Sequence, residues 1–191
     1  MFTHIKVQCI ILLITRDIIM SVSILTSRFN DETWLENCNY RKSHNEIACI
    51  YCSPQQITSK IEPNALLLII EMNNSQNKIE GIGLIRNLVK VTKYYRVYDT
   101  CNFNRFTYTG KYRIDRDTLL SYNARMVEMF DNILFKNKTH VKRGCGLTRI
   151  PEKLLKLDIC SPVGTAEQIK MELIHIFKTH HHSTKNTENM T

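Results

Sequence analysis

The stretch that decides the fold is ALLLIIEM at residues 65–72, followed by NNSQN at 73–77 and KIEGIGLIR at 78–86. A continuous apolar run of this length is typical of a strand that is buried on both faces. The polar segment after it has the composition of a turn, and the alternating segment is typical of a returning strand. The sequence therefore predicts a buried β-hairpin, in which Gly81 and Gly83 indicate a bulge or a close backbone approach.

Other segments extend the structure around this hairpin. Further strands are expected at 21–28, 94–98, 105–109 and 111–114, with a turn at Gly110 between the last two. Helices are expected at 31–37, 54–61, 117–134 and 165–177. In the first of these helices, Trp34 and Leu35 are expected to face the core. Strands with helices before and after them predict an α+β fold, here a small curved β-sheet flanked by helices, with a C-terminal helix.

Capping residues define the start of two of these helices. Ser53 as the N-cap, Pro54 in the first position and Gln56 in the third predict the second helix. Thr165 and Gln168 have the spacing of a capping box, which predicts the start of the last helix.

The length of 191 residues predicts one domain. Residues 20–179 are expected to form it, because 1–19 has the character of an N-terminal extension and 180–191 that of a disordered polar tail. Translation could start at the first residue or at Met20. The apolar run VQCIILLIT at 7–15 is much shorter than the roughly 20 residues of a membrane-spanning helix, so no membrane span is expected.

Seven cysteines lie at irregular spacings, and only Cys49 and Cys52 are close together. A structural zinc site needs a second such pair or a pair of closely spaced histidines. The sequence therefore predicts free thiols in a reducing compartment, and neither a metal nor another cofactor.

Positive charge is concentrated in one third of the chain. Residues 86–149 contain fourteen Lys and Arg against five Asp and Glu, whereas the rest contains twelve against thirteen. A positive field of this kind attracts polyanions, of which nucleic acid is the most common. An ordinary solvated basic surface is the alternative.

Aromatic and basic residues are interleaved in the segment 94–112, which contains seven of the sixteen aromatic residues in the chain. Aromatic faces stack on unpaired bases, and cations bind phosphates. We therefore expect Arg96, Arg105 and Lys111 to bind the nucleic-acid backbone, and Tyr95 and Phe106 to stack on bases. The alternative is that these rings pack in the core of a sheet.

A second basic segment, HVKRGCGLT at 140–148, combines Lys142 and Arg143 with two glycines. Glycines allow backbone N–H groups to approach an anion, and the adjacent cations supply charge. This loop is expected to bind phosphates, although a glycine turn in a solvated loop would have the same sequence.

The sequence evidence for a catalytic function is weaker than the evidence for a binding function. Cys52 is a candidate nucleophile with His44, and Glu71 is a candidate polar residue in a pocket. Neither lies in a motif that fixes a reaction, so the sequence favours a non-enzymatic protein.

Two stretches, EMNNSQNKIEGIGLIRN at 71–87 and HVKRGCGLTRIP at 140–151, resemble a group of uncharacterised proteins from large DNA viruses. The resemblance implies a viral protein in the cytoplasm or nucleus of the host cell, or in the virion. It implies no activity.

The order of elements is also similar to that of the PUA-like superfamily, which includes the YTH, EVE and ASCH domains. The matching tract is Tyr51-Cys52-Ser53, the helix at 54–61, the strand at 66–72 and the small residues at 81–84. The resemblance implies a small β-barrel that reads an unpaired or modified base. Tyr51 would form a wall of the base pocket, and Ser53 or Asn73 would supply a hydrogen bond.

These observations together predict a nucleic-acid-binding PUA-like module whose partner is single-stranded RNA or DNA. A viral protein-interaction or virion component with an acidic protein partner is the alternative from another class. An enzyme that uses Cys52 or Glu71 is the third possibility, and the oligomeric state stays open.

Overall fold

The computed structural model describes residues 22–136 and 140–188, so the predicted extension at 1–19 lies outside the described residues. The strands are β1 (Ser23–Phe29), β2 (Cys49–Ser53), β3 (Leu66–Asn73), β4 (Lys78–Arg86), β5 (Phe106–Gly110), β6 (Tyr112–Asp115) and β7 (Thr148–Arg149). The α-helices are α2 (Asp31–Lys42), α3 (Arg116–Phe135) and α4 (Ala166–Glu188). Short 3-10 helices lie at Cys101–Asn104, Glu152–Lys156 and Asp158–Cys160. The α+β class is confirmed.

The predicted hairpin forms the centre of a five-stranded sheet with the order β6-β4-β3-β1-β7. Strands β1 and β3 are parallel, and the other neighbours in this sheet are antiparallel. The register of the hairpin shifts between Glu71 and Met72, opposite Gly81. This shift is the bulge that the glycines predict. Strands β2 and β5 form a separate two-stranded sheet, and the five-stranded sheet is open, with β6 and β7 at its edges.

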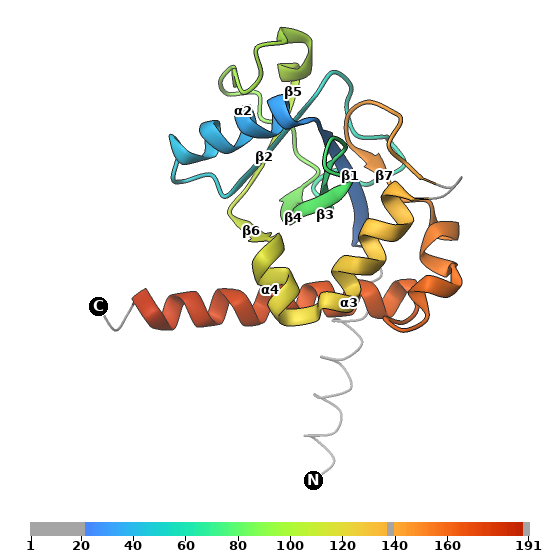
Figure 1. Ribbon diagram of the computed structural model, residues 1–191. Helices are drawn as coiled ribbons and strands as arrows, with labels where there is room; N and C mark the ends of the chain where they lie inside the picture. Colours follow the sequence, from blue (N-terminus) through green and yellow to red (C-terminus); the bar gives the residue numbers. More distant parts are fainter. Residues whose placement is uncertain (1–21, 137–139, 189–191) are drawn as a thin grey trace, which may run out of the picture.

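The five-stranded sheet lies between two layers, with β2, β5 and α2 on one side and α3 and α4 on the other (Figure 1). Strand β3 shows why its sequence is apolar throughout. Leu67 and Ile69 pack toward the small sheet, whereas Leu68 and Ile70 pack toward the helices. Both faces of this strand are therefore buried, as the continuous apolar run predicts.

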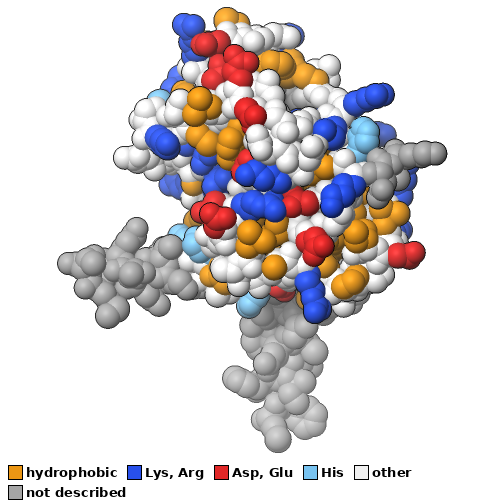
Figure 2. Space-filling view, in the orientation of Figure 1, with side chains coloured by type: hydrophobic (Ala, Val, Ile, Leu, Met, Phe, Trp, Pro, Cys, Tyr) orange, Lys and Arg blue, Asp and Glu red, His pale blue; other side chains and the backbone are white. Residues whose placement is uncertain are grey.

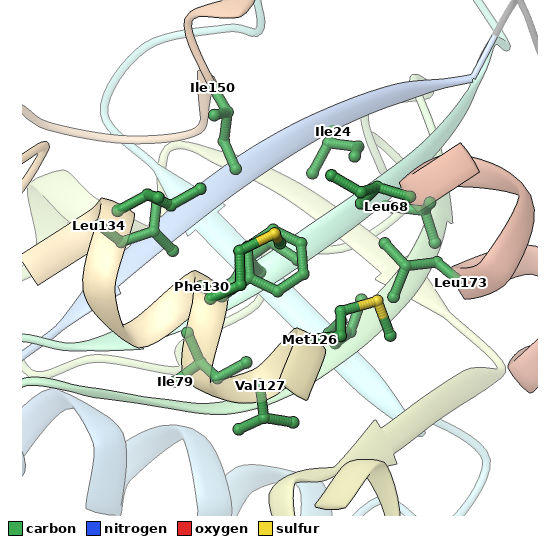
Figure 3. Packing of buried hydrophobic residues seen from close by; sticks show 14 of the residues in the cluster. Ile24, Leu68, Ile79, Met126, Val127, Phe130, Leu134, Ile150 and Leu173 are labelled. Atoms are coloured by element: carbon green, nitrogen blue, oxygen red, sulfur yellow. The ribbon is translucent and has the colours of Figure 1, made fainter. Parts of the chain in front are cut away.

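Helices α3 and α4 cover the sheet with a closely packed apolar face. Met126 and Phe130 of α3 and Leu173 of α4 lie against Ile24 and Leu68 of the sheet (Figure 3). The apolar residues of α3 recur at three- and four-residue spacing, which puts them on one side of the helix. The predicted capping box of α4 is present: Thr165 N donates to Gln168 Oε1 at 2.7 Å, and Gln168 N donates to Thr165 Oγ1 at 3.3 Å.

The predicted helix at 54–61 does not form. Ser53 is the last residue of β2, and its hydroxyl accepts a hydrogen bond from the Gln55 backbone N–H at 3.2 Å. This is the bond that an N-cap side chain makes to the second residue of a helix, so the cap is present although no helix follows it. Because Pro63 would limit such a helix to about two turns, its isolated stability is marginal, and burial of Ile57 and Ile61 in the core decides the conformation instead.

The predicted strand at 94–98 is also absent. The backbone N–H groups of Val97 and Tyr98 both donate to Asn104 Oδ1 at 3.0 Å. A buried side-chain amide therefore replaces the neighbouring strand as their partner. In α2, Trp34 packs edge-on against Phe29 as expected, but Leu35 is exposed and does not face the core.

Two other boundaries differ from the prediction. Strands β5 and β6 follow one another across Gly110, but β5 pairs with β2 and β6 pairs with β4. Gly110 allows this change of sheet, because a Cβ at this position would overlap the Leu84 carbonyl oxygen. Helix α4 continues to Glu188, through most of the segment predicted to be a disordered tail. Within the described ranges, no helix combines the length and apolar character needed to cross a membrane.

The close contact at Gly83 gives a test of this packing. A Cβ at Gly83 would overlap Tyr51 Oη and lie 2.9 Å from Cys49 Sγ. We expect Gly83→Ala to lower the free energy of unfolding by about 1–3 kcal/mol through overpacking. Chemical denaturation would measure this loss. In the Tyr51→Phe background the same substitution should cost less, and equal losses in both backgrounds would contradict the contact.

Candidate nucleic-acid interface

A groove with a volume of about 560 Å³ opens where β3 begins and β4 ends. We call it the basic groove. Its apolar residues are Ile47, Leu66, Leu84, Ile85 and Leu88; its polar and charged residues are Glu46, Arg86, Lys90, Lys93, Thr109 and Lys111; and Tyr95, Gly110 and Tyr112 complete it. Most of the residues come from β4, from the segment that follows it, and from the β5–β6 corner; Leu66 comes from β3, and Glu46 and Ile47 come from the segment before β2.

The groove is strongly positive. Its lining contains four cations, Arg86, Lys90, Lys93 and Lys111, against the single carboxylate of Glu46. Cations gathered in one concave surface reinforce one another's potential and raise the local concentration of anions. The lining therefore favours a polyanion.

Hydrogen bonds hold the segment after β4 against the rest of the protein. Asn87 Nδ2 donates to the carbonyl oxygens of Ile61 and Glu62 at 3.0 and 3.1 Å, and Lys90 N donates to the Thr107 carbonyl oxygen at 2.8 Å. These bonds position the backbone but leave the lysine ammonium groups to face the groove.

The two tyrosines of the groove differ in accessibility. Tyr112 is 41% exposed, and its ring meets that of His181 edge-on at 4.7 Å. Tyr95 is only 7% exposed, and Lys93 Nζ lies 4.8 Å from the centre of its ring. Tyr112 is therefore the ring on which a base could stack, and Tyr95 supports Lys93.

Of the residues that the sequence singles out, only Lys111 and Tyr95 line the basic groove. Lys142 and Arg143 lie near the other end of β3, where Asn74 Nδ2 donates to the Lys142 carbonyl oxygen at 3.0 Å. The eight residues of β3 span about 23 Å. The predicted phosphate-binding residues therefore do not share one surface.

Arg96 and Arg105 lie on the segment that leads to β5. Arg96 is exposed and forms a loose ion pair with Asp99 at 3.9 Å. Arg105 stacks over the ring of Phe106 at 5.2 Å, and Phe106, the first residue of β5, packs against the core on the side of the small sheet. Neither arginine lines the basic groove, and the ring of Phe106 is partly covered.

Three predicted base-pocket residues are buried. Tyr51 and Ser53 are 0% exposed and Asn73 is 1% exposed. Tyr51 Oη donates to Glu71 Oε1 at 2.7 Å, and Asn73 Nδ2 donates to Glu80 Oε1 at 2.9 Å. Their polar atoms are engaged inside the protein, so these residues do not form the wall of an open pocket.

Part of the positive charge of segment 86–149 is neutralised by ion pairs. Arg113 pairs with Glu71 at 2.8 Å, and Arg116 pairs with Asp131 at 2.7 Å. Figure 2 shows Lys and Arg side chains across the middle of one face with Asp and Glu side chains close to them. The charge count of the sequence is therefore larger than the charge that a ligand would meet.

The structure weakens both enzymatic candidates. Burial raises the pKa of Cys52 from its ordinary value of 9.0 to about 12, although the hydrogen bond with Thr107 opposes this rise. Such a thiol stays protonated near neutral pH and is a poor nucleophile. The Glu71 carboxylate accepts from Arg113 Nε, Arg113 Nη2 and Tyr51 Oη, so its oxygens are already bonded.

Comparison with known proteins adds no further residues to this interface. No protein-family model, curated protein or solved structure matches the chain. The role of the groove therefore has to be argued from its own chemistry.

The sequence did not single out Arg86, Lys90, Lys93 or Tyr112 as binding residues. They all lie in or at the start of the basic third of the chain, and Tyr112 ends the tract of aromatic and basic residues. That composition was the available signal. Composition alone could not show that the β5–β6 corner lies next to the end of β4, because that arrangement depends on the pairing of β4 with β6.

The reactivity of the cysteine thiols tests whether Cys52 could be a catalytic nucleophile. With a pKa of about 12, the Cys49 and Cys52 thiols should resist alkylation at pH 8 in the folded protein, whereas the exposed Cys101 and Cys145 should react. Peptide mapping by mass spectrometry would compare the four rates. Because burial favours the protonated thiols, the contribution of these two groups to stability is fully present below pH 9. It should be lost as the pH rises from 9 to about 12. Rapid labelling of Cys52 at pH 8 would restore it as a candidate nucleophile.

Proposed function

We propose that this protein binds single-stranded nucleic acid in the basic groove, with phosphates on its cations and a base on Tyr112. The observation that carries the proposal is the lining itself: four cations against one carboxylate, beside an exposed tyrosine ring, in one groove of about 560 Å³. Proteins that bind single strands combine a positive groove for the backbone with aromatic rings for the bases.

The exposed ring favours a single strand over a duplex. In a duplex the faces of the bases are stacked on one another and cannot reach a side chain. A ring at the edge of a positive groove is of use only to a strand whose bases are splayed out. Leu88 extends the apolar surface of the groove, since it is exposed beside the four cations.

The viral origin, the location in the host cell and the PUA-like arrangement are proposed from the sequence resemblances alone. We propose a viral protein that acts in the cytoplasm or nucleus of the host cell or in the virion, with a PUA-like arrangement. The order of β2, β3 and β4 supports the latter. The helix at 54–61 and a closed barrel are not part of that support, since the helix does not form and the five-stranded sheet is open. Reading of an unpaired or modified base would depend on Tyr112 and not on the buried Tyr51.

An acidic protein segment is the second candidate ligand. Leu88, Val91 and Tyr94 are exposed on the same segment that supplies Lys90 and Lys93. Apolar side chains next to cations suit a partner with alternating acidic and apolar residues. Co-purification of a stoichiometric protein after nuclease treatment, together with no binding to nucleic acid, would favour this candidate.

Salt dependence tests the electrostatic part of the proposal. Four phosphate contacts to a single strand predict a slope of about −2.8 in log affinity against log salt, or a loss of about fifty-fold between 50 and 200 mM. Fluorescence anisotropy with a labelled oligonucleotide of RNA or DNA would measure it. In the double variant Lys90→Ala/Lys111→Ala the slope should fall by about half. Lys153→Ala/Lys156→Ala removes the same charge from outside the groove and is the matched control. An unchanged slope in the groove variant would refute the assignment.

Tyr112 tests the stacking part separately. Loss of one stacked base costs about 1–3 kcal/mol, so Tyr112→Ala should weaken binding by about five- to 150-fold without changing the salt slope. Tyr112→Phe keeps the ring and should bind like the native protein. Equal losses in both variants would show that the hydroxyl group, and not stacking, is involved.

A further inference from the structure

A second cavity, of about 250 Å³, lies at the opposite end of β3 from the basic groove. Its lining is Ser27, Arg28, Phe29, Asn30, Thr33, Cys52, Pro54, Asn74, Tyr98, Phe103, Gly144, Cys145 and Gly146. We call it the Arg28 pocket. The parallel strands β1 and β3 both end here, and crevices at the carboxyl ends of parallel strands are a common place for ligands.

Arg28 is the one charged residue in the lining of this pocket. Its Nε donates to the Val141 carbonyl oxygen at 2.6 Å, and its Nη1 donates to Thr148 Oγ1 at 2.8 Å. Among the described residues, no carboxylate pairs with it and no hydrogen bond uses its Nη2. Burial lowers the pKa of Arg28. A partly buried guanidinium without a carboxylate is unusual, because buried charges are normally paired.

Asn74 adds an unused acceptor to the same pocket. Its Nδ2 donates to the Lys142 carbonyl oxygen, next in the chain to the Val141 carbonyl that Arg28 binds. Its Oδ1 is buried and has no hydrogen-bond partner, and it is the one such side-chain atom in the described part of the chain. A buried oxygen of this kind calls for a donor from a ligand or water. Asn74 lines the pocket, so this acceptor lies in the wall of the same cavity that Arg28 lines.

The segment at 144–146 forms one rim of the pocket. Gly144 and Gly146 have φ values of 121° and 73°, which other residues rarely adopt. A Cβ at Gly144 would lie 3.6 Å from Arg28 Cζ, so the rim passes directly over the guanidinium. The first turn of α2 adds little, because Thr33 N already donates to Asn30 Oδ1 at 2.8 Å and Asp31 N to Ser75 Oγ at 3.2 Å.

We propose that the Arg28 pocket binds a protonated phosphate group. A charged phosphate oxygen accepts a hydrogen bond from Arg28 Nη2, and the P–OH group donates to Asn74 Oδ1. The volume of about 250 Å³ leaves room for a phosphate group. The proposal is independent of the basic groove, because the two sites share no residue.

The Cys145 thiol provides a readout of occupancy. Cys145 is exposed and lines the pocket, whereas Cys101 is exposed and lies outside it. Alkylation by iodoacetamide would be followed at both residues in one sample by mass spectrometry, with increasing inorganic phosphate at pH 6.5 and constant ionic strength. We expect phosphate to slow the labelling of Cys145 at least fivefold and to leave Cys101 unchanged. Sulfate has no proton to donate to Asn74 and should protect less. No protection by phosphate would overturn the proposal.

Two variants test the assigned residues. Arg28→Gln should abolish the protection of Cys145. Because this substitution also removes the bonds to Val141 and Thr148, Asn74→Asp is the second variant: it keeps the size of the side chain, loses only the Nδ2 bond to the Lys142 carbonyl oxygen, and places a negative charge beside the ligand. Circular dichroism would establish that each variant is folded. Protection that persists in folded Asn74→Asp protein would refute the proposal.

The source of the phosphate can be read from the same assay. Inorganic phosphate, uridine 5′-monophosphate, and oligonucleotides with a 5′-phosphate or a 5′-hydroxyl end would be compared as protectants. Protection by only the phosphorylated oligonucleotide would indicate a nucleic-acid end, whereas protection by all three phosphates would indicate recognition of the group alone. Protection should persist in Lys90→Ala/Lys111→Ala protein, which distinguishes failure of the pocket from failure of the groove.

Discussion

The structure depends on one buried interaction, the binding of the Glu71 carboxylate by Arg113 and Tyr51. Glu71 lies on β3, in the middle of the large sheet, and is 0% exposed. Removing a carboxylate from water costs several kcal/mol unless a cation and hydrogen-bond donors compensate for it. Here Arg113 of β6 and Tyr51 of β2 provide them. Burial alone lowers the pKa of Arg113, but the Glu71 carboxylate outweighs this effect and raises it, so Arg113 remains protonated.

This interaction restricts how the neighbouring strands can pack. Arg113 must cross β4 to reach Glu71, and Tyr51 must reach it from the small sheet. Both side chains pass over β4 at Gly81 and Gly83, where a Cβ would meet Arg113 and Tyr51. The two glycines are therefore a consequence of the buried carboxylate. The same register places Tyr112, the neighbour of Arg113, beside the end of β4, where the basic groove forms.

The elements that could be predicted from the sequence are those whose local pattern agrees with their burial. The hairpin and α3 have apolar residues at the spacing that their packing requires. The helix at 54–61 had good capping residues, but Ile57 N donates to Tyr108 Oη of β5 at 3.1 Å, and Ile57 and Ile61 are buried in the core. The strand at 94–98 had the right composition, but Asn104, seven residues later, binds its backbone. In both cases a contact outside the segment outweighs local preference.

The same distinction applies to the candidate sites. Composition indicated a basic third of the chain, but it could not show which cations would be neutralised. Arg113 and Arg116 are used in ion pairs, while Lys90, Lys93 and Lys111 line a groove. The sequence did not indicate a binding role for Arg28, since a lone arginine in a predicted strand is common. Its lack of a carboxylate partner becomes visible only when the neighbours from β7 and the segment at 140–146 are placed around it.

The two candidate sites lie at opposite ends of β3, and this follows from how the sheet is built. Residues along β3 are buried on both faces, so neither face is open to a ligand. At the ends of β3, loops connect to the rigid sheet. Side chains on such loops are not constrained by packing in the core. At one end these segments leave lysines around an exposed ring. At the other they leave, among the described residues, an arginine without a carboxylate partner and an amide oxygen without a hydrogen-bond partner. The fold therefore places two candidate sites of different chemistry at the ends of β3: an extended groove that takes its cations from the basic third of the chain, and a small pocket whose cation, Arg28, comes from β1.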